Sequence, residues 1–134
     1  MTCFLCFLTG LESLGINMEH TIENQTDALK YVIQMRCFAI SDEIASVVSD
    51  LDRVDGCIER FARLKQPIID LVNLASFNYK FYDDIKSVYE PFISRRWNRE
   101  NGVGSRQVHR RSMELVKVWR AIVRALSAHD IIKL

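Results

Sequence analysis

The chain has 134 residues, of which 49% are hydrophobic and 26% charged, with only 5 Gly and 2 Pro. These values fit one folded domain with an ordinary apolar core, and they exclude collagen-like and disordered chains. No stretch approaches the ~18 uninterrupted apolar residues of a membrane-spanning helix. The formal net charge of +1 hides a strong asymmetry along the chain.

Residues 1–17 form an apolar N-terminal segment, which we separate from a single domain at 18–134. The segment contains a compact run of Phe and Leu residues and no Lys or Arg. It is interpreted either as a helix that docks on the domain or as a leader that precedes a start at Met18. A secretory signal needs a basic region before its apolar run. Secretion with residues 1–15 as a signal peptide is therefore the minority interpretation, and a cytoplasmic protein is expected.

The four cysteines do not predict a metal site. Cys3 and Cys6 have C-x-x-C spacing, but a structural zinc site needs a second pair of ligands. Cys37 and Cys57 lie inside helical patterns, where reduced thiols act as small buried hydrophobes. We expect no metal and no cofactor. In a secreted protein, Cys37 and Cys57 would instead be candidates for a disulfide.

The spacing of apolar residues predicts an all-α protein. From Ile44 to Phe61 they recur in steps of three and four, which is the pattern of a helix packed along its length and not of a strand with its period of two. The step changes next to Ser41. The sequence therefore leaves open whether 27–65 is one helix or is divided into 27–40 and 42–65.

Two prolines and a glycine-rich loop divide the rest of the chain. Pro67 predicts the end of one helix and the first turn of the next, at 67–90. Asn101-Gly102-Val103-Gly104-Ser105 predicts a loop, followed by a last helix at 105–129. Short connections between three or four main helices favour an antiparallel bundle. The segment 77–92 is rich in aromatic residues, and any that one core face cannot hold would be exposed and mark an interface.

Charge is segregated along the chain. Residues 1–94 carry 8 basic and 14 acidic groups, whereas residues 95–124 carry 9 basic and 2 acidic groups. The basic region either pairs with acids of the other helices or forms a surface for an acidic protein, nucleic acid or anionic membrane. The acids available for pairing are Asp50, Asp52, Asp55, Glu59, Asp83 and Asp84. The candidate binding residues are Arg95, Arg96, Trp97, Arg99, Arg106, Arg110, Arg111 and Arg120.

One short pattern suggests catalysis. Arg124 and His129 are separated by four residues, Ala-Leu-Ser-Ala. This Arg-x4-His spacing resembles the signature of HEPN ribonucleases, which are small all-α domains that act as dimers. The resemblance implies that both residues face a scissile phosphate, the His for proton transfer and the Arg for charge. It covers six residues, and Ala125 replaces the polar residue usual after the Arg.

Three functions follow from these patterns, in order of preference. The first is a non-enzymatic protein-protein interaction or regulatory module, in which a partner or a second copy covers surplus apolar surface. The second is nucleic-acid binding through the Arg-rich region 95–124, where Trp97 among arginines is suited to stacking on bases. The third is a ribonuclease that uses Arg124 and His129.

Overall fold

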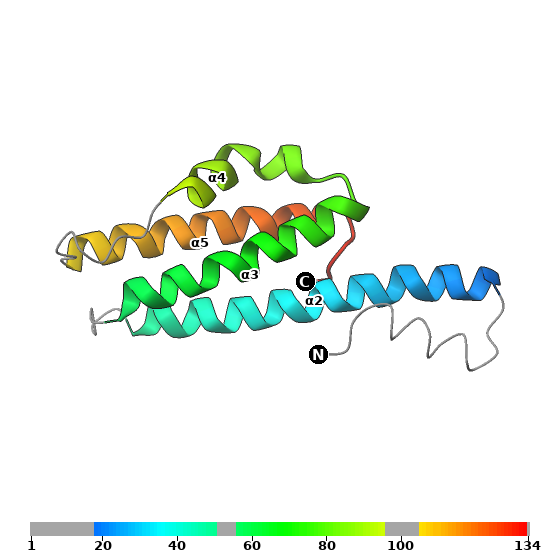
Figure 1. The fold of residues 1–134 in the computed structure, drawn as a ribbon, viewed down its shortest axis with the longest axis horizontal. Coiled ribbons are helices and arrows are strands. Elements are labelled where there is room, and N and C mark those ends of the chain that lie inside the picture. The colour runs from blue at the N-terminus through cyan, green and yellow to red at the C-terminus, as the bar shows by residue number, and fades with distance from the viewer. Residues whose placement is uncertain (1–17, 51–55, 96–104, 134) are drawn as a thin grey trace.

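The computed structural model describes residues 18–50, 56–95 and 105–133. This part of the chain is helical and contains no strand. Its four helices are α2 (Met18–Ser49), α3 (Cys57–Asn78), α4 (Tyr82–Ser94) and α5 (Ser105–Ala128). Figure 1 shows that α2 runs antiparallel to α3 and that α4 runs antiparallel to α5, with the N-terminal part of α2 extending beyond the other helices. The predicted all-α antiparallel bundle is confirmed, while the apolar segment 1–17 lies outside the described residues.

The core forms where one face of every helix meets the others. Ile33 and Val47 of α2, Phe61 of α3 and Ile85 of α4 are fully enclosed. In the last helix, one apolar face is buried: Val108, Leu115, Trp119, Ile122 and Leu126. Burying a side chain of this size contributes roughly 1.5–3 kcal/mol, so the packed faces hold the helices in place.

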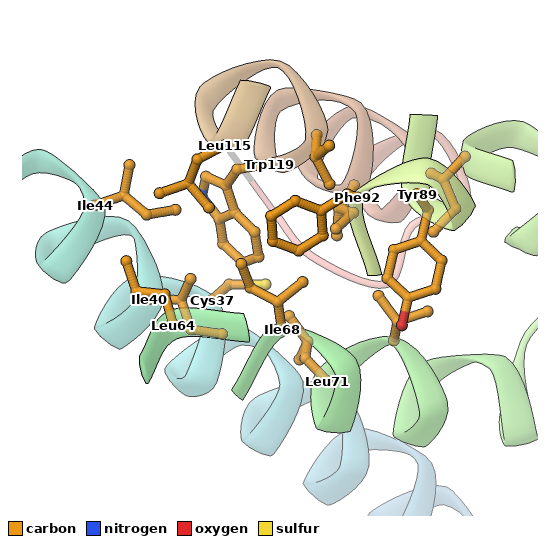
Figure 2. Packing of buried hydrophobic residues seen from close by; sticks show 14 of the residues in the cluster. Cys37, Ile40, Ile44, Leu64, Ile68, Leu71, Tyr89, Phe92, Leu115 and Trp119 are labelled. Atoms are coloured by element: carbon orange, nitrogen blue, oxygen red, sulfur yellow. The ribbon is translucent and has the colours of Figure 1, made fainter. Parts of the chain in front are cut away.

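Trp119 connects α5 to α2. Its ring packs among Leu115, Phe92 and residues of α2 in the centre of the bundle (Figure 2). The indole Nε1 donates a hydrogen bond of 2.9 Å to Ser41 Oγ on α2. Because a buried indole N–H needs an acceptor, Ser41 serves the core and does not cap a helix. This contact fixes which faces of α2 and α5 point inward.

The expected division of 27–65 is wrong in both of its forms. α2 passes through Ser41 without interruption and ends at Ser49, and α3 begins at Cys57. Gly56 precedes α3 with φ 83°, a left-handed conformation that glycine adopts without steric cost. The break therefore falls at the α2–α3 connection, where the sequence predicted continuous helix.

The expected helix at 67–90 is also wrong. Pro67 lies inside α3, which continues to Asn78, and α4 starts afresh at Tyr82 with Pro91 inside it. Burial explains why α3 continues, because Leu64 before the proline and Ile68 after it both lie in the core. Packing on both sides offsets the lost backbone hydrogen bond of Pro67.

The end of α5 agrees with the expected boundary near residue 129. Ile131 N–H donates to Leu126 O at 2.8 Å and Asp130 N–H donates to Ser127 O at 3.0 Å. Asp130 has φ 57°, and these features together form a Schellman motif. Leu126 and Ile131 are both buried, which supplies the apolar contact that accompanies this motif.

Two of the cysteines lie in the described part of the chain. Cys37 and Cys57 are both buried, and no disulfide joins them. Burial raises the pKa of the Cys37 thiol to about 12, so this thiol stays neutral in the folded protein. None of the described helices is both long and apolar enough to cross a membrane.

Candidate binding surface on helix α5

The outer face of α5 carries a line of basic residues. We call it the basic stripe, and it consists of Arg106, Arg110, Met113, Lys117, Arg120 and Arg124, all exposed. Successive members are four, three, four, three and four residues apart, so they stay on one side of a helix for about 27 Å. The opposite side of the same helix holds Leu115, Ile122 and Leu126 in the core. Core packing thus orients the stripe directly toward solvent.

The cations of the basic stripe are not neutralised within the described structure. The ion pairs between described residues involve other cations, namely Arg60, Arg95, Arg111 and His129. Lys117 lies three residues from Arg120, and Arg120 four residues from Arg124, distances at which like charges on a helix repel by roughly 0.2–0.5 kcal/mol per pair. The stripe therefore leaves five positive charges available to an anionic partner.

Two predicted binding residues, Arg95 and Arg111, form ion pairs with Glu114. Arg95 Nη2 lies 3.0 Å from Glu114 Oε1, and Arg111 Nη1 lies 3.4 Å from Glu114 Oε2. The Arg111 side chain is only 14% exposed, so it is not part of the exposed basic stripe. Lys65 Nζ also donates to Arg95 O at 2.9 Å. Glu114 thus joins the end of α4 to α5, while the predicted binding residues Arg96, Trp97 and Arg99 lie outside the described residues.

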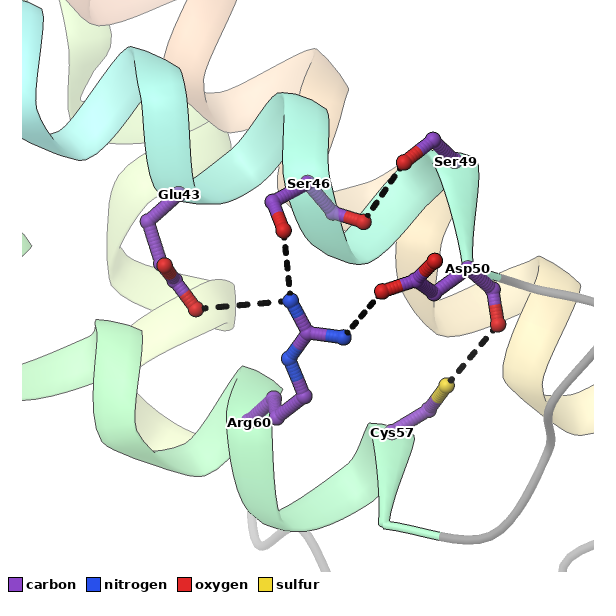
Figure 3. Close-up of polar contacts among 6 residues, drawn as sticks. All are labelled: Glu43, Ser46, Ser49, Asp50, Cys57 and Arg60. Atoms are coloured by element: carbon purple, nitrogen blue, oxygen red, sulfur yellow. Dashed lines mark hydrogen bonds and ion pairs between the residues drawn. The ribbon is translucent and has the colours of Figure 1, made fainter.

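Of the described acids that the sequence offers for pairing with the last helix, Asp50 pairs with α3 instead, whereas Asp84 contacts His129 directly after α5. Arg60 Nη1 on α3 lies 2.9 Å from Asp50 Oδ2, and Arg60 Nη2 donates to Ser46 Oγ at 2.8 Å and lies 3.6 Å from Glu43 Oε1. Figure 3 shows this guanidinium held between the end of α2 and the start of α3. The hydrogen bond to Asp50 raises the pKa of Arg60 above its ordinary value. Asp50 therefore stabilises the α2–α3 hairpin and does not neutralise α5.

The two residues of the Arg-x4-His pattern, Arg124 and His129, lie in different surroundings. His129 Nε2 lies 2.7 Å from Asp84 Oδ2 at the start of α4. His129 lines a shallow depression of about 330 Å³ together with residues of α3, α4 and the turn between them. Arg124 is a member of the basic stripe and does not line that depression. The described structure thus gives the two side chains separate surroundings.

A second exposed surface consists of apolar residues of α2 that the sequence did not single out. Tyr31, Met35 and Phe38 of α2 are 65%, 48% and 49% exposed. They lie at positions i, i+4 and i+7, on the side of α2 opposite the core residues Ile33 and Ile40. The sequence contains apolar residues on both sides of this helix, and only the packing reveals which side stays outside. Phe77, in the aromatic segment, is 90% exposed.

The described residues contain no group of three or more His, Cys, Asp or Glu side chains arranged to hold a metal ion. Comparisons with protein-family models, curated proteins and solved structures found no match to this chain. The candidate functional surfaces of the described chain are therefore the basic stripe on α5 and the exposed apolar side chains on α2.

Proposed function

We propose that this chain is a non-enzymatic interaction module that binds an acidic protein surface through the basic stripe of α5. The observation that carries the proposal is that five cations share one exposed side of a helix without an ion-pair partner among the described residues. Four of the five are arginines, whose planar guanidinium forms bidentate hydrogen bonds with carboxylates. Binding an acidic surface would relieve the repulsion between them.

The spacing of the stripe favours a protein over a nucleic acid. Alternating steps of three and four residues match the contact line between two packed helices. Met113, at the middle of the stripe and 73% exposed, offers a flexible apolar contact of the kind used at protein interfaces. The stripe contains no aromatic side chain, whereas binding of unpaired bases relies on aromatic stacking. These features support an acidic helix as the partner.

Binding to poly-L-glutamate, compared with poly(U) RNA, tests this proposal. The variant Arg110→Glu/Lys117→Glu/Arg120→Glu should bind poly-L-glutamate at least about tenfold more weakly, since each exposed pair contributes roughly 0.2–1 kcal/mol. The matched control is Arg63→Glu/Lys80→Glu/Lys86→Glu, which changes the net charge equally at exposed positions of α3, α4 and the turn between them. The control should retain binding.

Two results would contradict the proposal. An equal loss of binding in both triple variants would mean that net charge alone attracts the polyanion. Tighter binding to poly(U) than to poly-L-glutamate, with the steep salt dependence of phosphate contacts, would instead support the nucleic-acid function of the region 95–124.

A further inference from the structure

The exposed apolar side chains of α2 lie between two acidic residues. Asp27 precedes Tyr31 by four residues and Asp42 follows Phe38 by four, and both aspartates are exposed. Neither aspartate forms an ion pair with another described residue. We call Asp27, Tyr31, Met35, Phe38 and Asp42 the α2 stripe. It is about 22 Å long, with an apolar centre and a negative charge at each end.

The α2 stripe and the basic stripe have complementary chemistry at matching positions. When two helices are placed antiparallel with Met35 opposite Met113, Asp42 lies seven residues from the centre and faces Arg106, also seven residues away. Asp27, eight residues from the centre on the other side, faces Arg120 at seven. The largest mismatch is thus one residue, or about 1.5 Å. Both ends would form ion pairs.

The intermediate positions match as well. Phe38 lies three residues from the centre and so does Arg110, while Tyr31 and Lys117 each lie four residues from it. A cation over the face of an aromatic ring is attracted by the electrons of the ring. All five members of the α2 stripe therefore meet a suitable group on the basic stripe.

The two stripes of one molecule cannot contact each other. α2 and α5 already pack through their inner sides, where Trp119 donates its hydrogen bond to Ser41. Both stripes lie on the opposite sides of their helices, away from the core. Contact between them must therefore join two molecules.

We propose that the acidic partner of the basic stripe is the α2 stripe of a second copy of this chain. This inference rests on the proposed function, because it assigns a partner to the same surface. Each copy carries both stripes, and the contact is head-to-tail, so that assembly continues into a chain or closes into a ring. A single pair of helices buries less area than a typical permanent interface. Association should consequently depend on protein concentration and weaken with salt.

Exchange of charges between the two stripes tests the contact. The 134-residue chain should show a mass above 15.6 kDa that rises with concentration in sedimentation velocity. Asp27→Lys/Asp42→Lys and Arg106→Glu/Arg120→Glu should each remain monomeric, because like charges would meet at both ends of the contact. A chain with all four substitutions should associate again, since its end charges are exchanged but still opposite. Circular dichroism checks that every variant is folded.

The control variant is Arg63→Glu/Lys86→Glu, which changes charge at exposed positions outside both stripes and should associate like the original protein. If Tyr31→Ser/Phe38→Ser abolishes association but Arg106→Glu/Arg120→Glu leaves it unchanged, the contact joins two α2 helices. That result would overturn the inference. A monomer at every concentration would also overturn it. If that monomer still binds poly-L-glutamate through the basic stripe, the proposed function stands without this partner. If the monomer does not bind poly-L-glutamate through the basic stripe either, both the proposed function and this inference are wrong.

Discussion

Two buried ionisable side chains show how packing changes the chemistry of single residues. Cys37 lies among core residues of α2, and burial raises the pKa of its thiol to about 12 from 9.0. Tyr89 of α4 is 2% exposed, and burial, with smaller contributions from Tyr82 and Asp70, raises the pKa of its hydroxyl from 10.0 to about 12. Both groups therefore remain neutral in the folded protein at pH values where they ionise in the unfolded chain.

We expect the free energy of unfolding to fall as the pH rises above about 9. The unfolded state releases the Cys37 proton near pH 9 and the Tyr89 proton near pH 10, while the folded state keeps both until about pH 12; ionisation therefore favours the unfolded chain. Urea midpoints measured at pH 8, 9, 10 and 11 should decrease in that order. Cys37→Ala and Tyr89→Phe should each flatten the decrease. Identical slopes in the original protein and both variants would contradict this assignment.

At the scale of the helix, the sequence predicts the type of each element better than its ends. The apolar series from Ile44 to Phe61 looks continuous because seven residues, 50–56, separate α2 from α3. Seven residues are one full heptad, so the spacing in the sequence keeps its phase across the turn. The local feature next to this connection is Gly56, which precedes α3 with a left-handed φ of 83°.

Pro67 misleads for a related reason. A proline fits the first turn of a helix by local preference, but Leu64 and Ile68 on either side of it are both in the core. The backbone of α3 therefore stays helical through Pro67, although a proline inside a helix costs free energy. Tertiary contacts of this kind link residues that are distant in sequence, and local patterns therefore cannot reveal them.

Replacement of Pro67 distinguishes the two assignments of this helix. Pro67 is exposed in the interior of α3, where proline is about 3 kcal/mol less favourable than alanine. Greater freedom of the unfolded chain offsets about 0.4–1 kcal/mol of the gain. Pro67→Ala should thus raise the free energy of unfolding in urea by about 2 kcal/mol. A neutral or destabilising result would indicate that a helix starts at Pro67, as the sequence alone predicts.

At the scale of the whole molecule, the sequence predicts where charged residues cluster better than it predicts which side chains are exposed. Arg106, Arg110 and Arg120 are predicted from the sequence as binding residues, and the structure places them on one exposed side of α5 with Met113 and Lys117. Arg111 could not be separated from them by sequence, because its low exposure is a property of the folded bundle. The exposure of Tyr31, Met35 and Phe38 likewise depends on which side of α2 the other helices cover.

Repulsion within the basic stripe should lower the free energy of unfolding of the single chain. Arg120→Glu replaces two repulsions, with Lys117 and Arg124, by two attractions, and each change of sign is worth roughly 0.4–1 kcal/mol for pairs at these spacings. At a concentration where the chain is monomeric, this variant should be about 1 kcal/mol more stable in urea at low salt, and Arg120→Gln should gain about half as much. Both gains should shrink at 0.5 M salt because ions screen exposed charges, while binding to poly-L-glutamate should weaken in both variants.

Stability and binding that change in opposite directions are expected where surface residues serve a function at a cost to the fold. A loss of stability on Arg120→Glu would instead mean that Arg120 stabilises the bundle itself.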